Sequence, residues 1–355
     1  MQLGTLFRPP TVGLDIGSSG IKAVVLRRSR SIWSLIAAGE APLPDGSMRD
    51  GAVTDAPAVS EAVGSLLDSM RMRRARVAAA LSGHAVIVKR LSLPTMSPAE
   101  LSEAIPWEAE QYIPFDLAEV QLDYQVVGTG GEASKSALDV LLVAAKRDRI
   151  DDRAGIIAQA GRQPVVLDIE AFALANAYQM NYPERTDPLS ALIHVGRHLT
   201  IVCLLERAEP VFTRDISIGG QVHVDALLRE FGSQGLDELG AKRILNGQYP
   251  AGMDTERIAS VLRDASGQLV LEVRKTMDFF RATSPVERVS RIVLSGGGWQ
   301  ALGLVDQLAA EFSAPVDVFD PFRKIAKSAR ATAPEAAGPA YAVAVGLAMR
   351  QGESR

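Results

Sequence analysis

One stretch near the amino terminus sets the architecture of the chain: Gly13-Leu14-Asp15-Ile16-Gly17-Ser18-Ser19-Gly20-Ile21-Lys22-Ala23-Val24-Val25-Leu26. An apolar run meets an acid, turns through Gly and Ser, and resumes as β-rich sequence, which predicts a strand, a tight turn and a second strand. Gly17 and Gly20 allow backbone angles closed to other residues, so the amides between them can point into one concavity and bind an anion. An ordinary hairpin with Asp15 as a turn acceptor fits the same pattern.

The phosphate-binding interpretation assigns a role to Asp15 and a set of candidate residues to this hairpin. Asp15 occupies the last inward position before the turn, where its carboxylate can hold a hydrated Mg²⁺ beside bound phosphates. The candidate ligand-binding residues of the hairpin are Asp15, Gly17, Ser18, Ser19, Gly20 and Lys22.

Two later segments also place glycines where an apolar strand ends. Residues 193–204 repeat the order of strand, polar residue, Gly-bearing turn and second strand, which suggests duplicated halves facing each other across a cleft. Residues 292–298 end a strand in three glycines, on which a flat ring or a ribose could lie directly against the backbone. The candidate ligand-binding residues of these two segments are Gly196, Arg197, Gly296, Gly297 and Gly298.

These three segments, in this order, resemble the actin-like ATPase superfamily of sugar kinases, heat-shock chaperone ATPase domains, actin and the division protein FtsA. By this resemblance they are the first phosphate loop, the second phosphate loop and the adenosine loop, and the ligands are ATP and Mg²⁺. The implied fold class is α/β, with duplicated ribonuclease H-like halves around a nucleotide cleft.

The composition restricts the class of protein. With 355 residues, 47% hydrophobic and 23% charged, the chain is ordinary for a soluble protein of about two domains. A net charge of −4 argues against nucleic-acid binding, and the basic run at residues 71–76 is interpreted as a solvated helix end. The single cysteine, Cys203, is predicted to be a core residue in a reducing compartment. Residues 1–11 lack a signal-peptide core and residues 340–349 are too short to span a bilayer, so we expect a cytoplasmic protein.

Residues 84–163 differ in pattern from the segments on either side and predict an inserted α+β subdomain. Ser97-Pro98-Ala99-Glu100 is a capping box that announces a helix, and apolar strands are predicted at 85–93, from Val120 onward and at 138–145. Residues 105–116 carry Trp107, Tyr112 and Phe115 and predict a helix start or kink that Pro114 stops. These aromatic side chains are interpreted either as core residues or as a partner surface.

Further segments narrow the resemblance to one family. Residues 107–126, with Glu-Ala-Glu-Gln-Tyr-Ile-Pro-Phe and Leu-Asp-Tyr-Gln-Val, resemble the PilM family of type IV pilus assembly proteins. The other segments that carry this resemblance are residues 168–177, 212–220, 272–280 and 342–348. The resemblance implies an FtsA-like architecture and a partner, the short N-terminal cytoplasmic tail of a single-span inner-membrane protein of the PilN type. That partner would hold the chain at the inner membrane.

This architecture predicts how the chain divides. The first actin-like half comprises residues 1–83, 164–188 and 335–355, with a third strand at 31–43, a helix that Asp55 caps and a strand at 76–81. The inserted subdomain of the FtsA type comprises residues 84–163. The second half comprises residues 189–334 and includes a helical subdomain at about 221–283, with a long helix from about 254 to 283.

The resemblance also implies roles for single residues. Glu170 occupies the position that orients the attacking water, and the acid and base that touch the adenosine correspond to Glu238 and Lys242, four residues apart on a helix. The second phosphate loop departs from the family, because His194 replaces its acid and a neutral imidazole is a poor partner for hydrated Mg²⁺. Arg197 is either a phosphate clamp or a solvent-facing residue of a decayed loop.

The sequence therefore predicts an ATP-binding scaffold of type IV pilus assembly with slow or no ATPase activity. Other pilus components of the inner membrane and a second copy of the chain remain open as further partners. One alternative, a small-molecule kinase, would need a substrate-binding acid and a larger insert. Another, a filament-forming division protein like FtsA, would need an amphipathic membrane helix, whereas residues 349–355 have no apolar face.

Overall fold

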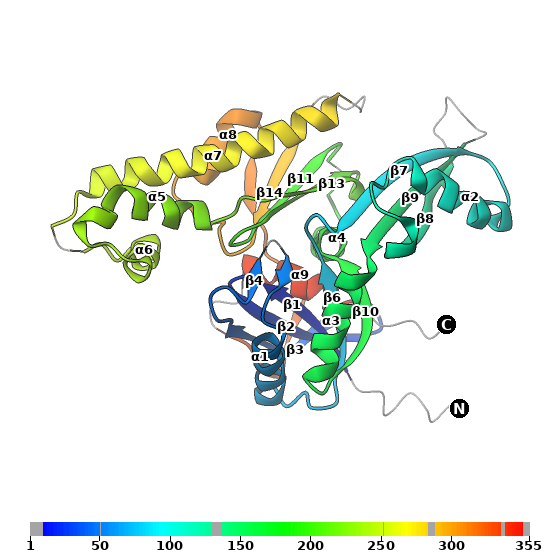
Figure 1. Ribbon diagram of the computed structural model, residues 1–355, viewed down its shortest axis with the longest axis horizontal. Helices are drawn as coiled ribbons and strands as arrows, with labels where there is room; N and C mark the ends of the chain where they lie inside the picture. Colours follow the sequence, from blue (N-terminus) through cyan, green and yellow to red (C-terminus); the bar gives the residue numbers. More distant parts are fainter. Residues whose placement is uncertain are drawn as a thin grey trace.

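The computed structural model describes residues 10–49, 51–129, 137–185, 187–250, 252–282, 288–334 and 338–350. Figure 1 shows two α/β halves, one above the other, with an inserted unit on one side and an arm of helices on the other. Among the described residues, no helix combines the length and the apolar character needed to cross a bilayer.

The first half is built on a six-stranded sheet with the order β10-β6-β1-β2-β3-β16. Its centre is the hairpin of β1 (Thr11–Gly17) and β2 (Gly20–Ser29), in which Gly17 pairs with Gly20. The predicted strand-turn-strand at residues 13–26 is therefore confirmed, and β3 (Ile32–Pro42) matches the predicted third strand. The other strands of this sheet are β6 (Arg76–Leu81), β10 (Gln163–Ile169) and β16 (Ala326–Thr332).

The second half repeats this arrangement with a five-stranded sheet of order β13-β12-β11-β14-β15. Here β11 pairs antiparallel with β12 and parallel with β14, just as β1 pairs with β2 and β6. The duplication that the sequence suggests is thus present in the sheets. The strands are β11 (Ser190–Val195), β12 (Thr200–Glu206), β13 (Glu209–Ile216), β14 (Arg291–Ser295) and β15 (Val316–Val318).

Two helices, α4 (Glu170–Asn181) and α9 (Ala342–Ala348), join the halves. One core cluster holds Tyr178 of α4 and Val345 of α9 together with residues of β2 and β12, among them Cys203, which is fully buried as predicted. The helices pack so closely that a Cβ added at Gly346 would lie 1.8 Å from the Ala173 carbonyl oxygen. Glycine is required there for contact between the helices.

The predicted boundary at residue 334 does not match the sheets. It assigned β16 to the second half, but β16 pairs parallel with β3 of the first sheet. A strand can add to a sheet edge that offers free backbone groups, and β16 adds beside β3 as the outer strand of the first sheet. The chain therefore returns to the first half before residue 334.

The inserted unit is a three-stranded sheet of order β7-β9-β8 with one helix against it. Its elements are β7 (Val86–Pro94), α2 (Pro98–Glu110), β8 (Val120–Thr129) and β9 (Ala137–Lys146). The predicted capping box at Ser97 and Glu100 is confirmed. Of the predicted helix start or kink at 105–116, the helix start is wrong, since residues 105–110 are the second half of α2. Pro106 lies inside that helix, where proline removes a backbone hydrogen bond.

The helix α3 (Arg147–Gln159) shows a second difference from the predicted division, which placed it in the insert at 84–163. Its Ile156 and Ile157 are buried in the first-half core with Val63 and Leu67 of α1 (Ala56–Ser69). Because these apolar side chains face the first sheet, α3 packs as a helix of the first half. The unit that stands apart is formed by residues 86–146.

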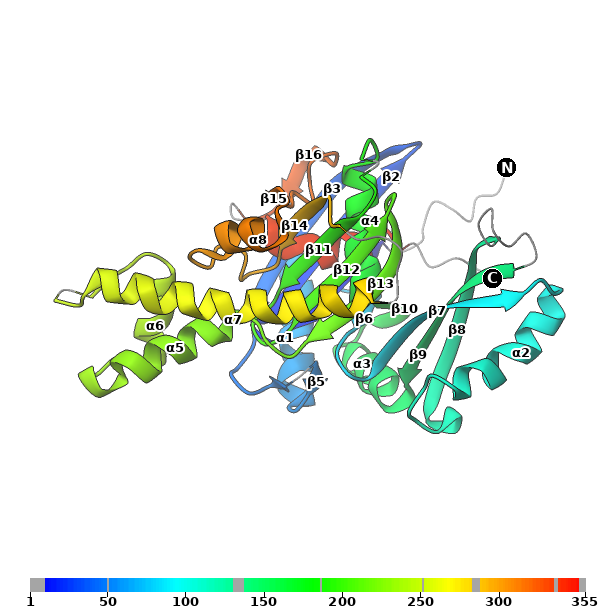
Figure 2. The same ribbon diagram turned by 90° about the horizontal axis from the view of Figure 1, so that it is seen from above.

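Figure 2 shows the arm of helices extending from the second half on the side away from the insert. It consists of α5 (Gln221–Phe231), α6 (Glu238–Leu245) and the long α7 (Thr255–Arg281), in agreement with the predicted helical stretch. The remaining elements are the short hairpin β4 (Met48–Arg49) and β5 (Ala52–Val53), and α8 (Leu304–Phe312). The basic run at residues 71–76, the predicted helix end, lies beyond α1: residues 71–75 form the connection to β6, and Arg76 is the first residue of that strand.

Candidate functional site

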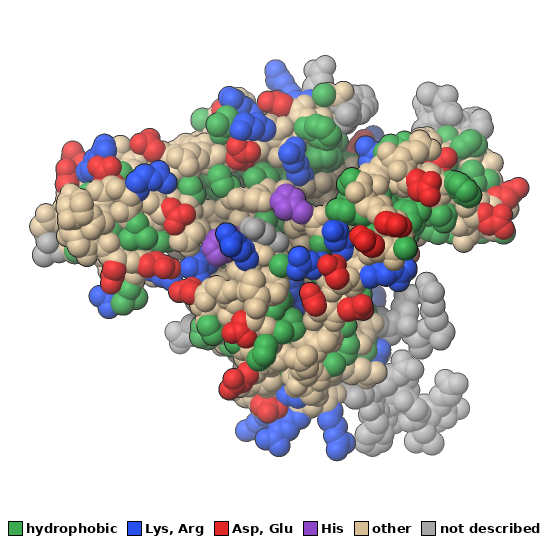
Figure 3. Space-filling model, viewed as in Figure 1, with side chains coloured by type: hydrophobic (Ala, Val, Ile, Leu, Met, Phe, Trp, Pro, Cys, Tyr) green, Lys and Arg blue, Asp and Glu red, His purple; other side chains and the backbone are tan. Residues whose placement is uncertain are grey.

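A cleft of about 610 Å³ lies between the two halves and the helical arm. Figure 3 shows Lys, Arg and His side chains gathered where the upper and lower halves meet. The structure brings most of the predicted site residues to this cleft: Asp15, Gly17, Ser18, Ser19, Lys22, Glu170, Gly196, Arg197, Lys242, Gly297 and Gly298 line it. Gly20, Glu238 and Gly296 are not among the residues that line it.

The β1–β2 hairpin places an acid and a base side by side at the floor of the cleft. Asp15 and Lys22 are directly opposite each other in the antiparallel register. Burial raises the pKa of the Asp15 carboxyl, while Lys22 and Arg153 partly offset this effect. Packing requires glycine at position 20, because a Cβ there would lie 2.7 Å from the Ala41 carbonyl oxygen of β3.

Glu170 is the first residue of α4 and lines the same cleft half-buried. The Ser82 hydroxyl donates a hydrogen bond to its Oε1 at 2.8 Å. Burial, together with the nearby carboxyls of Asp15 and Asp215, raises the pKa of Glu170 to about 8. At neutral pH this carboxyl is therefore mostly protonated, and a protonated carboxyl cannot accept a proton from water.

In the second hairpin, His194 is the next-to-last residue of β11. It is buried, and its Nδ1 lies 3.0 Å from the Ser295 hydroxyl at the end of β14. Burial, with a smaller effect of Lys22, lowers the pKa of His194 to about 3, so the ring is neutral. A neutral imidazole in this place offers no carboxylate oxygen to a magnesium ion.

Arg197, in the turn after β11, is bound to other side chains. Its Nε donates to Gln221 at 2.9 Å, and its two terminal nitrogens contact Asp45 and Glu238. Glu238 is also 2.7 Å from Lys242 on α6. The predicted pair Glu238–Lys242 therefore exists, but as part of an ionic cluster that includes Arg197.

The three glycines after β14 differ in what requires them. A Cβ at Gly296 would lie 2.2 Å from the Val195 carbonyl oxygen, and one at Gly298 would lie 2.5 Å from the Val195 side chain. A Cβ at Gly297 would meet no heavy atom within 4 Å. Only Gly297 keeps an open space in front of it.

Sequence reasoning missed the apolar wall of the cleft and a histidine within its lining. The wall comes from α5, α6, α7 and the loops after α6 and β14, and consists of Val224, Ile244, Leu245, Tyr249, Leu262 and Leu302. His223 of α5 also lines the cleft and is otherwise buried, with its Nε2 2.9 Å from the Ser266 hydroxyl of α7. No local pattern marks these residues, because they belong to ordinary amphipathic helices that tertiary packing brings together.

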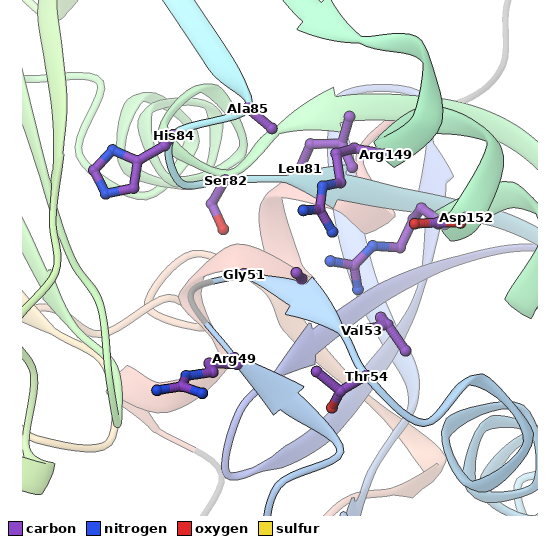
Figure 4. A pocket seen from close by; sticks show the side chains of 12 residues that line it. Arg49, Gly51, Val53, Thr54, Leu81, Ser82, His84, Ala85, Arg149 and Asp152 are labelled. Carbon is purple, nitrogen blue, oxygen red and sulfur yellow. The ribbon is translucent and has the colours of Figure 1, made fainter.

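A second cavity of about 320 Å³ lies at the base of the insert. Figure 4 shows Arg149 of α3 and the Ser82 side chain above the β4–β5 hairpin, from which Arg49 projects. We call this cavity the crevice; it is lined by Arg49, Gly51, Ala52, Val53, Thr54, Leu81, Ser82, His84, Ala85, Arg149, Asp152 and Arg153. Gly51 and Ser82 line both the crevice and the cleft.

The segment that enters the insert is also tied to the second half. The backbone N–H of Gly83 donates to the carboxyl of Asp215 on β13, and His84 Nε2 lies 2.9 Å from the Ser217 hydroxyl. Burial raises the pKa of Asp215, and the Gly83 amide partly offsets this effect. The wall of the crevice is thus attached to both halves of the molecule.

The residues present fit a nucleotide with a weakly held metal. Over the part of the chain that the structure describes, no three His, Cys, Asp or Glu side chains are grouped to hold a metal ion. Magnesium in nucleotide sites is commonly held by one or two carboxylates plus the phosphates, and Asp15 can supply one. The open face of Gly297 and the apolar wall suit a flat base and its ribose.

Comparison with known proteins gives one family and one fold. The family model described as "Type IV pilus assembly protein PilM" matches residues 13–352. A solved structure described as the PilM-PilN type IV pilus biogenesis complex matches with a TM-score of 0.83 and 29% identity, over 98% of this chain and 100% of that chain.

Two more distant structures share the fold. The ethanolamine utilization protein EutJ from Carboxydothermus hydrogenoformans has a TM-score of 0.55 and 18% identity, over 97% of this chain and 90% of that one. MreB5 of Spiroplasma citri bound to ADP has a TM-score of 0.54 and 14% identity, over 95% and 94% of the two chains. The predicted actin-like α/β fold is confirmed.

Proposed function

We propose, from the premise that this chain belongs to the type IV pilus assembly protein PilM family, that it is an ATP-binding scaffold of pilus assembly. In this proposal a PilN-like protein is the partner, and its N-terminal tail holds the scaffold at the inner membrane. The observation that carries the proposal is the pair of adjoining cavities, one suited to a nucleotide and one to an extended peptide, which share Gly51 and Ser82.

The cleft supports nucleotide binding through three groups of residues. The amides of Gly17, Ser18 and Ser19 at the β1–β2 turn, with Lys22, would hold the phosphates. Gly297 would leave room for the base and ribose against the apolar wall. Asp15 would hold Mg²⁺ through water, and the ion would neutralise phosphate charge when bound.

The same cleft is poorly equipped for fast hydrolysis. Glu170 is protonated near neutral pH, and His194 supplies a neutral ring where an acid is expected. Phosphoryl transfer depends on positioned charges. The protonated Glu170 and the neutral His194 each leave an uncharged group where a negative charge is expected. Bound ATP would therefore act mainly by setting the angle between the halves.

The crevice supports the binding of an extended peptide. It lies in the first half at the base of the insert, where the guanidinium of Arg149 meets apolar side chains such as Val53 and Leu81. A peptide lying there would form main-chain hydrogen bonds and place apolar side chains in pockets. By the likeness to the PilM-PilN complex, we assign this place to the PilN-like tail.

Calorimetric titration with ATP, in the presence and absence of Mg²⁺, tests the nucleotide part of the proposal. The wild-type chain should bind, and Asp15→Ala should lose the Mg²⁺-dependent part of the affinity. Steady-state turnover should stay below about 1 per second, the lower end of ordinary enzymes. A folded Asp15→Ala variant that keeps both the wild-type affinity and its dependence on Mg²⁺ would show that Asp15 does not hold the metal.

A further inference from the structure

Four charged side chains from both halves meet at the edge of the cleft. Asp45 comes from the turn between β3 and β4 in the first half, Arg197 from the turn between β11 and β12, and Glu238 and Lys242 from α6. Arg197 contacts Asp45 and lies 2.9 Å from Glu238, and Lys242 lies 3.7 Å from Asp45 and 2.7 Å from Glu238. The four charges sum to zero, and every acid contacts both bases.

Within this cluster, only Asp45 belongs to the first half. Arg197 is fixed to the second half twice more, because its side chain bonds Gln221 and its carbonyl accepts from the Gln221 amide at 2.8 Å. The pairs of Asp45 with Arg197 and with Lys242 are therefore the contacts that cross between the halves here. Breaking them leaves the cluster on the second half intact.

The exposure of the four side chains places the cluster at the outer edge of the cleft. Arg197 and Lys242 line the cleft, and their side chains are 17% and 40% exposed. The Asp45 side chain does not line it and is 62% exposed. A molecule that enters the cleft on this side has to pass the Asp45 contacts.

We propose that Asp45, with Arg197 and Lys242, forms an ionic latch that holds the two halves together at the mouth of the cleft and opens whenever a ligand enters or leaves. The latch is separate from ligand binding itself, since Asp45 does not line the cavity. Its control of nucleotide exchange rests on the proposed function, whereas its control of the distance between the halves does not.

A distance measurement in the ligand-free protein tests the latch directly. Spin labels on Glu61→Cys of α1 and Arg229→Cys of α5 would report the separation of the halves, because both positions are exposed and the native Cys203 is buried. Asp45→Asn should give a longer or broader distance distribution than the otherwise unchanged chain. Salt at about 1 M, where the Debye length is about 3 Å, should move the unchanged chain toward the same distribution and leave Asp45→Asn almost unaffected.

The matched control is Glu184→Gln. Glu184 also bridges an arginine and a lysine, Arg323 and Lys324, but far from the cleft residues. This variant should keep the original distance distribution. If Asp45→Asn also keeps it, or if Glu184→Gln changes it equally, the latch is refuted.

Stopped-flow binding of a fluorescent ATP analogue then tests exchange. A latch slows entry and exit alike, so Asp45→Asn should raise both the association and the dissociation rate constants by about threefold or more, as two surface ion pairs allow. A rise in the dissociation rate alone would make Asp45 a ligand contact and overturn the latch. If the wild-type chain binds no analogue, the proposed nucleotide function fails, while the distance measurement still decides on the latch.

Discussion

At the scale of single residues, the glycines of the β1–β2 turn and of the loop after β14 serve two different purposes: some allow close packing of the protein, and one leaves open space for a ligand. Gly20, Gly296 and Gly298 are needed by the protein itself, because a Cβ at each would meet the backbone or side chain of a neighbouring strand. Gly297 has no such neighbour. A glycine motif therefore does not by itself tell which of its members faces a ligand.

This difference gives a prediction for Gly297→Val. A valine there should leave the free energy of unfolding nearly unchanged, because the added atoms meet open space, yet it should weaken ATP binding by about tenfold or more. Gly298→Val is the contrasting variant and should destabilise the fold, since its Cβ would overlap Val195. Calorimetric titration and denaturant unfolding measure the two effects. Full ATP affinity in Gly297→Val would remove this loop from the nucleotide site.

The raised pKa of the half-buried Glu170 carboxyl gives a pH-dependent prediction. Its pKa is about 8 in the folded protein, so between about pH 4.5 and pH 8 the folded state holds a proton that the unfolded state has released. The free energy of unfolding should therefore fall as the pH rises through this range. Glu170→Gln should show a shallower fall and be more stable than the wild type at pH 8.5, by an amount on the order of 1 kcal/mol.

Urea unfolding at several pH values measures this effect. The exposed Glu61→Gln of α1 is the control and should follow the wild-type curve. Some slope should remain in Glu170→Gln, because burial also raises the pKa values of Asp15 and Asp215. Parallel curves for wild type and Glu170→Gln would contradict the protonated state of this carboxyl at neutral pH.

At the scale of elements, the insert is a small sheet with its own core, attached at two adjacent points. The Lys146 amide donates to the Ala85 carbonyl at 3.0 Å, so the chain leaves the first half and returns to it at neighbouring residues. Its apolar residues, such as Leu101 and Val140, pack among themselves. Trp107 on its helix is 73% exposed, while Phe115 packs against the insert core, so the core interpretation holds for Phe115 and fails for Trp107.

These attachment points define a deletion that tests the role of the insert. Removing residues 86–145 and joining Ala85 to Lys146 should leave a folded chain that still binds ATP, because α3 stays in the first-half core. In cells it should lose membrane association through the PilN-like partner. Co-sedimentation of the folded deletion variant with membranes that carry the partner would show that the insert is not needed, because all the residues that line the crevice remain in this variant.

Removal of residues 84–163 is the contrasting deletion. It takes away Ile156 and Ile157, which are buried in the first-half core, and should not fold. A finer test uses Arg149→Gln in the crevice, with Arg147→Gln on the same helix as its control. Only Arg149→Gln should weaken the binding of a synthetic tail peptide. For the unchanged chain we expect a binding free energy of about −8 kcal/mol, which corresponds to a micromolar dissociation constant.

At the scale of the whole molecule, two sheets enclose α4 and α9, and contacts between the halves surround both cavities. Ser82 lies between the cleft and the crevice and hydrogen-bonds Glu170. The next residues, Gly83 and His84, contact Asp215 and Ser217 of the second half. A change of the angle between the halves therefore moves the wall of the crevice.

This arrangement predicts that ATP and the tail peptide affect each other's binding. Saturating ATP and Mg²⁺ should change the dissociation constant of the peptide by about fivefold or more, and saturating peptide should change that of ATP by the same factor, as linkage requires. Ser82→Ala should reduce this factor while the chain stays folded. Identical peptide affinity with and without ATP would show that the two cavities act independently.

The sequence by itself determined the two hairpins, the order of the strands around them and the glycine loops, because alternation of apolar residues and turn chemistry are local. The capping box at Ser97, the long α7 and the burial of Cys203 follow from the same local rules. The resemblance to one family was also available from short segments spread along the chain.

Only the tertiary structure decided which residues share a cavity and which are already paired. The contact of Arg197 with Asp45 joins positions 152 residues apart, and no spacing in the chain reveals it. The place of β16 beside β3 and of α3 in the first-half core likewise depends on free edges and complementary apolar faces, which exist only after the chain has folded. Charged side chains pair and apolar faces pack only when they lie close together in space. For residues far apart in the chain, that closeness depends on the complete fold.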